Sequence, residues 1–157
     1  MKRIIIVVFA LIVGVSAFSG CTKKDNSTGT TSGSGYKMAA SIGSTPFSWD
    51  SCAYHQSTGG IDTINIINGF RTDSFGYTRY PTIDLYFAGK LAIGTYTLGT
   101  ISDKSNASYI TGISTFNYSV NGSITITAVS PNVVGTFNFN TDTGPSISNG
   151  SFTAQIQ

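Results

Sequence analysis

The only histidine of the chain, His55, follows Cys52 by three residues in the segment WDSCAYHQ, residues 49–56. A cysteine and a histidine within hydrogen-bond reach form a nucleophilic pair, because the imidazole removes the thiol proton. On a helix this spacing places both side chains on one face, whereas on a strand the two point to opposite faces. The surrounding residues are typical of a strand, so we expect Cys52 to be a packed free thiol and His55 a polar residue at a strand end. A β-bulge is the irregularity that would reunite the pair.

Other catalytic chemistry has few candidate residues. A zinc site takes three or four Cys, His or carboxylate ligands, and a calcium site takes a loop dense in oxygen ligands; neither pattern occurs, so no metal or other cofactor is predicted. Glycoside hydrolysis generally uses two carboxylates about 5 to 10 Å apart. The chain has no glutamate, and Asp84 alternates with apolar residues, which places it on an outward strand face. A hydrolase therefore remains an alternative only if distant aspartates meet in the fold, the candidates being Asp50, Asp62, Asp73, Asp84, Asp103 and Asp142.

The N-terminus has the order of an export signal. Lys2 and Arg3 precede an apolar run over residues 4–18. This run is shorter than the roughly 20 residues that span a bilayer as a helix. It ends in Ser-Gly-Cys21, which resembles the lipobox of bacterial lipoproteins, in which the peptidase cuts before the cysteine and the cysteine receives acyl chains. We therefore expect residues 1–20 to be a lipoprotein signal peptide and Cys21 to anchor the mature chain in a membrane.

Removal of this leader changes the charge of the protein. The formal net charge of +2 includes Lys2 and Arg3, and the remaining basic residues are matched in number by aspartates. Without a basic face, nucleic-acid binding lacks its main source of affinity. Acylation of Cys21 also leaves Cys52 without a disulfide partner in its own chain.

The mature chain divides into a linker and one domain. Residues 21–35 are mostly Ser, Thr and Gly after the cysteine and cannot bury enough surface to fold, which predicts a flexible tether. Residues 36–157 are long enough for a single domain with its own core. They are rich in Thr, Ile, Tyr and Phe, residues that suit strands, and no segment predicts a helix.

Alternating apolar residues predict eight to ten short antiparallel strands, arranged as a β-sandwich or a closed barrel. One strand is expected from Phe47 to about Tyr54. Near the C-terminus, Asn121-Gly122 separates two alternating runs and predicts a tight hairpin turn. Residues 116–156 are thus expected to form a four-stranded meander.

The remaining positive feature is the density of aromatic residues. Tyrosine and tryptophan offer contact area with a polar tip, as sugar-binding and protein-binding surfaces require. The segment GFRTDSFGYTRYP, residues 69–81, predicts a long loop or hairpin in which such residues gather. The candidate ligand contacts are Trp49, Tyr54, Phe75, Tyr77, Arg79 and Tyr80, although each aromatic ring could equally cap the core.

Several strand and turn patterns resemble a family of uncharacterised single-domain lipoproteins of Bacteroidota-type bacteria. The resemblance rests on Met38-x-Ala40-x-Ile42-Gly43 with Pro46-Phe47-x-Trp49, and on GTY, GSITIT, VGTFNF and SNGSF, which begin at residues 94, 122, 134 and 148. It implies an all-β fold and an outer-membrane location, with the leaflet left open, and it supplies no catalytic residues. We expect a non-catalytic envelope module that binds a glycan or an envelope protein; the alternative is a structural or assembly component that pairs through its strand edges.

Overall fold

The computed structural model describes residues 35–59 and 62–157, which form ten β-strands and no helix. This confirms the all-β fold and the expected number of strands. The signal peptide expected at residues 1–20, the lipidation of Cys21 and the tether up to residue 34 lie outside the described residues. The strands are β1 (Lys37–Ile42), β2 (Thr45–Trp49), β3 (Ser51–Gly59), β4 (Asp62–Thr72), β5 (Thr78–Ala88), β6 (Gly94–Leu98), β7 (Asn106–Gly112), β8 (Thr115–Ala128), β9 (Val133–Thr141) and β10 (Ile147–Ile156).

Seven of these strands close into a barrel. The pairing runs β10-β3-β4-β5-β7-β8-β9 and returns to β10. All neighbours are antiparallel except β10 and β3, which meet in parallel through Gln155 opposite Ala53 and Ile156 opposite Tyr54. Strands β1 and β2 extend the sheet beside β10, and β6 pairs with the second half of β8. The closed pairing identifies the fold as a barrel rather than an open sandwich.

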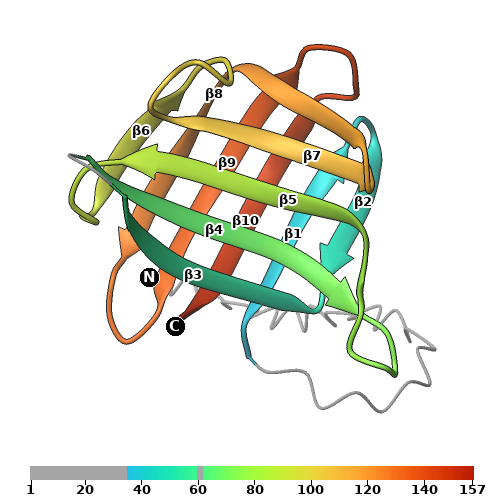
Figure 1. Ribbon diagram of the computed structural model, residues 1–157, viewed down its shortest axis with the longest axis horizontal. Helices are drawn as coiled ribbons and strands as arrows, with labels where there is room; N and C mark the ends of the chain where they lie inside the picture. The colour runs from blue at the N-terminus through green and yellow to red at the C-terminus, as the bar shows by residue number, and fades with distance from the viewer. Residues whose placement is uncertain (1–34, 60–61) are drawn as a thin grey trace, which may run out of the picture. The chain divides into compact units, whose positions relative to one another are not determined.

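Figure 1 shows two sets of strands that cross at a steep angle. Strands β3, β4, β5 and β7 lie in front and, with the first half of β8, form what we call the front sheet. Strands β1, β8, β9 and β10 run behind it. The two sets enclose a core whose largest fully buried side chains include Trp49, Phe87, Phe139, Met38 and Ile67. The interior of the barrel is therefore packed with side chains.

The expected strand over residues 47–54 is two strands. The chain bends at Asp50, where it leaves β2, paired with β1, and enters β3, paired with β4. This corner resets the alternation, so Trp49 and Cys52 are both buried although an unbroken strand would point them to opposite faces.

The expected hairpin at Asn121-Gly122 is wrong. Strand β8 continues through Gly122, which pairs with Phe139 on one side and Leu98 on the other. Its φ is +153°, and a Cβ atom there would lie 2.3 Å from the carbonyl oxygen of Asn138. The glycine therefore serves close packing within a long strand and not a turn. As a result, the expected four-stranded meander is a three-stranded one, made of β8, β9 and β10.

Candidate functional site

The outer face of the front sheet carries a groove made of two adjoining cavities. One has a volume of about 440 Å³ and the other about 300 Å³. Both are lined by Asp84, Ile110 and Phe116, so they form one continuous depression, which we call the groove. Its other polar lining residues are His55, Asn68, Thr78, Thr82, Asn106, Ser108 and Gln157.

Strand alternation and register bring these side chains together. On β5, Ile83 and Leu85 are fully buried in the core, and Asp84 between them points to the outer face. Asn68 of β4 stands directly opposite Asp84, and Ser108 of β7 stands opposite it on the other side. Asp84 is therefore the central residue of a row that crosses three neighbouring strands.

A chain of side-chain hydrogen bonds runs along the groove. His55 Nε2 donates to Asn68 Oδ1. The amide nitrogen of Asn68 donates to Asp84 Oδ1 at 2.6 Å, and the Tyr86 hydroxyl donates to Asp84 Oδ2 at 3.3 Å. A carboxylate has about four acceptor positions. Asp84 thus keeps acceptor capacity for a ligand while its orientation is fixed by Asn68.

Burial decides the electrostatics of Asp84. Desolvation raises the pKa of its carboxyl group, and the hydrogen bonds from Asn68 and Tyr86 and the nearby charge of His55 oppose that rise. Among the described residues that line the groove there is no lysine or arginine. The groups that donate directly to the carboxylate are neutral, and the nearby positive charge comes from His55.

Aromatic rings surround these polar groups. Phe70, Tyr80 and Phe116 line the larger cavity, and Tyr86 and Tyr118 join Phe116 in the smaller one. The rings of Phe116 and Tyr118 are nearly parallel, with centroids 6.0 Å apart and planes inclined by 7°. The groove thus combines flat apolar faces with hydrogen-bonding groups, a combination typical of small-ligand sites.

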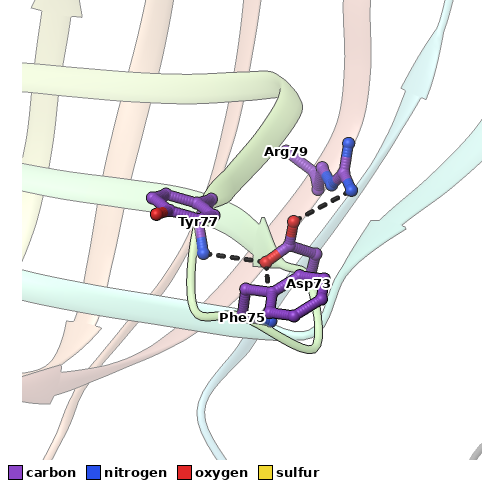
Figure 2. Close-up of polar contacts among 4 residues, drawn as sticks. All are labelled: Asp73, Phe75, Tyr77 and Arg79. Carbon is purple, nitrogen blue, oxygen red and sulfur yellow. Dashed lines mark hydrogen bonds and ion pairs between the residues drawn. The ribbon is translucent and has the colours of Figure 1, made fainter.

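The turn between β4 and β5, residues 73–77, directly precedes Thr78, which lines the groove. The side chain of Asp73 fixes the shape of this turn. Asp73 Oδ1 accepts hydrogen bonds from the backbone N–H groups of Phe75 and Tyr77, each at 2.9 Å, and Oδ2 pairs with Arg79 at 2.9 Å. Figure 2 shows the carboxylate between the guanidinium group and the two backbone nitrogens. These bonds, that from Tyr77 first, lower the pKa of the Asp73 carboxyl group.

The same turn carries the most exposed aromatic rings of the described residues. The exposed fractions of Phe75 and Tyr77 are 83% and 72%, and Tyr80, which follows closely, is 43% exposed and lines the groove. The expected long loop or hairpin is therefore a hairpin that presents its aromatic side chains to solvent.

The six candidate contact residues from the sequence separate into two groups. Trp49 and Tyr54 are 1% and 5% exposed, and both bond to other residues of the fold: Trp49 Nε1 to the carbonyl oxygen of Pro81 at 2.6 Å, and the Tyr54 hydroxyl to Asn65 at 2.8 Å. Neither ring is available to a ligand. The other four, Phe75, Tyr77, Arg79 and Tyr80, gather at the β4–β5 turn and at the adjoining end of the groove.

Cys52 and His55 lie on opposite faces of β3. The thiol is buried in the core and is a free cysteine, and burial raises its pKa to about 12. His55 lines the groove, and β3 pairs with β4 without a bulge over its whole length. The arrangement does not form a Cys-His pair, and the thiol stays protonated and unreactive at neutral pH.

Sequence reasoning missed the residues at the centre of the groove. The sequence does not single out Asn68, Phe116 or Tyr118 as site residues, and Asp84 was expected only to lie on an outward strand face. The available signal was the outward position of Asp84 between Ile83 and Leu85, which the structure confirms. Its neighbours in the groove come mostly from other strands, whose register the alternation does not give.

Within residues 35–59 and 62–157, no group of three or more His, Cys, Asp or Glu residues is placed to hold a metal ion. No helix in this part of the chain has the length and apolar character that a membrane crossing requires.

A family model described as "Domain of unknown function (DUF6252)" matches residues 73–155, which is more than half of the chain. The match covers the β4–β5 turn, all of β5 to β9 and nearly all of β10, and so includes Asp84, Phe116 and Tyr118. His55, Asn68 and Phe70 lie before it. No curated protein and no solved structure matches the chain.

Proposed function

The chain belongs to the DUF6252 family of domains of unknown function, and we propose that it is a non-catalytic binding module whose groove takes a glycan. The observation that carries this proposal is the ring-lined groove around Asp84. Sugar rings present apolar C–H faces and a rim of hydroxyl groups. Aromatic rings pack against the C–H faces, and carboxylate and amide groups with spare hydrogen-bonding capacity bind the hydroxyl groups.

The position of the groove favours a glycan over an extended peptide. Peptides that add to a sheet use unpaired backbone groups at an edge. Strands β4, β5 and β7 under the groove are each paired on both sides, so their backbone groups are engaged within the sheet. A ligand here is recognised by side chains alone, which suits a ring-shaped ligand rich in hydroxyl groups.

The carboxylates favour binding over hydrolysis. Glycoside hydrolysis generally needs two carboxyl groups about 5 to 10 Å apart. Asp84 is the one aspartate among the described side chains that line the groove. The hydrolase alternative therefore gains no support from this face of the barrel.

The assembly alternative depends on free strand edges. The outermost strands, β2 and β6, are five residues each, and β2 contains Pro46. Short edges and proline are features that hinder pairing with another chain. A binding groove is thus better supported than strand addition.

We further propose that the module is a lipoprotein held at the outer membrane by acyl chains on Cys21. The support is the order of charged residues, apolar run and Ser-Gly-Cys in the sequence. A linker rich in Ser, Thr and Gly between Cys21 and the barrel would let the groove reach ligands at some distance from the lipid surface.

Binding of the full chain to a panel of neutral glycans tests the main proposal. Asp84→Ala should lower the affinity by about tenfold or more, because it removes the central acceptor of the groove. The matched control is Asp50→Ala, which removes an exposed aspartate at the β2–β3 corner outside the groove. A folded protein that binds no glycan of the panel, or equal losses in both variants, would contradict the proposal.

Metabolic labelling with a fatty-acid analogue tests the anchor separately. The wild-type chain and a Cys52→Ser variant should both be labelled and should both be found with membranes. The Cys21→Ser variant should not be labelled and should not be found with membranes. Label retained in the Cys21→Ser variant would disprove lipidation at that residue.

A further inference from the structure

We infer that the ligand of the groove is a linear chain of sugar units, and that the β4–β5 turn, residues 73–77, binds the part of that chain that extends beyond the groove. This inference rests on the proposed function. It adds the length of the ligand and a second contact surface, formed by Phe75 and Tyr77.

The first support is the extent of the groove. Its lining residues come from five neighbouring strands, from β3 with His55 to β8 with Tyr118. At about 4.8 Å between neighbouring strands, the four intervals amount to about 19 Å. One sugar ring cannot contact both ends. The two cavities, joined at Asp84, instead offer successive positions along a chain.

The second support is the repetition of flat rings along this path. Each cavity has its own aromatic residues, Phe70 and Tyr80 in the larger and Tyr86 and Tyr118 in the smaller, with Phe116 between them. Phe116 and Tyr118 present nearly parallel planes. A ligand made of repeated rings matches a surface on which flat faces repeat.

The third support is the continuity between groove and turn. Thr78 and Tyr80 line the larger cavity, and Tyr77 directly precedes Thr78. The rings of Phe75 and Tyr77 are among the most exposed in the described part of the chain. The larger cavity therefore reaches the first residues of β5, directly after the turn that carries these two rings.

The fourth support is that hydrogen bonds and an ion pair within the chain fix the shape of the turn. Asp73 accepts two backbone hydrogen bonds within the turn and pairs with Arg79 (Figure 2). Exposed rings on a loose loop would lose conformational entropy when they bind, whereas rings on a fixed turn lose less. Asp73 is thus a positioning residue for Phe75 and Tyr77.

The charge of the site narrows the ligand class. The groove contains a carboxylate, and no lysine or arginine is among its described lining residues. An acidic sugar would place its own carboxylate near Asp84, and like charges in a partly desolvated site repel. The inferred ligand is therefore a linear glycan of uncharged sugars.

Calorimetry with an uncharged glycan identified by the panel, in two-unit and six-unit lengths, tests this inference on the full chain. The wild type should bind the six-unit chain about tenfold more tightly than the two-unit chain. The Phe75→Ala/Tyr77→Ala variant should bind the two-unit chain as the wild type does and lose the gain from length. Asp73→Asn, which keeps both rings, should lose part of that gain.

The outcomes separate the two proposals. Equal wild-type affinities for both lengths, or a full gain from length in the double variant, would overturn the inference and leave the binding module intact. Failure of the wild type to bind either length would overturn the proposed function as well. Because Phe75 and Tyr77 are exposed, the double variant should keep the wild-type thermal stability, and circular dichroism checks this.

Discussion

Two asparagines three residues apart on β4 point to opposite faces of the front sheet and belong to different hydrogen-bond networks. Asn65 lies inside the barrel, where its Oδ1 accepts from the Tyr54 hydroxyl at 2.8 Å and its Nδ2 donates to the carbonyl oxygens of Phe87 and Gly89 at 3.0 and 2.8 Å. It is fully buried, and both of its amide hydrogens are used. The inner network is therefore closed and serves the fold.

Asn68 belongs to an open network on the outer face. Its Oδ1 accepts from His55, and its Nδ2 donates to Asp84 at 2.6 Å. One amide hydrogen and part of the acceptor capacity of Asp84 remain for a partner. The comparison shows that residue type alone does not identify the polar groups of the proposed site; spare hydrogen-bonding capacity next to a groove does.

Alanine at each asparagine should give the largest contrast between the two faces. Asn65→Ala leaves the buried Tyr54 hydroxyl and two carbonyl oxygens without their partner, so the free energy of unfolding should fall by about 2 to 4 kcal/mol. Asn68→Ala opens its site to water and should cost less than about 1 kcal/mol. Urea unfolding followed by tryptophan fluorescence measures both, because Trp49 is buried.

Glycan binding should reverse this order. The folded fraction of Asn68→Ala should lose about tenfold in affinity because Asp84 is no longer oriented, whereas folded Asn65→Ala should bind as the wild type does. Asn138→Ala, which removes a similar amide from the exposed face of β9, is the control for both measurements. Equal stability losses at Asn65 and Asn68 would remove the distinction between closed and open networks.

Asp84 and Asp73 should change the stability of the protein with pH in opposite directions. The pKa of Asp84 is raised by burial, so the folded protein binds this proton more tightly than the unfolded chain does. Stability therefore falls as pH rises from the ordinary carboxyl pKa, about 3.9, to the raised value. Asp84→Asn removes this slope and should be more stable than the wild type at neutral pH, with the difference vanishing in acid.

Asp73 gives the opposite sign. Its pKa is lowered, first by the hydrogen bond from the backbone of Tyr77, so its contribution is present above the ordinary carboxyl pKa and is lost as pH falls through the lowered value. Asp73→Asn should thus be less stable than the wild type at neutral pH and equal to it in strong acid. Urea unfolding between about pH 2 and pH 7 tests both variants. Slopes of the same sign would show that Asp84 is not held in a desolvated site.

The sequence predicts the features of this site that follow from alternation within one strand, but not those that depend on the register between paired strands. Alternation around Asp84 indicates its outward position, and the residues typical of strands indicate an all-β domain; both agree with the structure. The hairpin register does not follow from the same pattern. Arg79 stands opposite Arg71, but a bulge between Gly69 and Arg71 shifts the pairing beyond it. A regular hairpin would place Asn68 opposite Thr82, whereas the bulge places it opposite Asp84.

The remaining errors have a related physical cause. Asn121-Gly122 carries the residues of a tight turn, yet β8 needs its glycine because Asn138 of β9 approaches too closely for a Cβ atom. The corner at Asp50 turns Trp49 and Cys52 both inward. In each case the pairing of whole strands overrides a local preference, and local patterns do not contain that pairing.

The smallest effects expected from the comparison are those of two tyrosine hydroxyl groups. Tyr54 donates to Asn65 at 2.8 Å inside the barrel, and Tyr86 donates to Asp84 at 3.3 Å on the outer face. Tyr54→Phe removes the hydrogen bond to the buried Asn65 Oδ1 and should lower the free energy of unfolding by about 1 kcal/mol. Tyr86→Phe removes the longer hydrogen bond to Asp84, which lies beside solvent, and should lower it by less than about 0.5 kcal/mol. Both replacements keep the ring, so packing is unchanged and urea unfolding reports the hydroxyl group alone. If Tyr86→Phe lowered the free energy of unfolding as much as Tyr54→Phe does, the outer network would also stabilise the barrel. Its open hydrogen-bonding positions would then no longer distinguish it as a site for ligands.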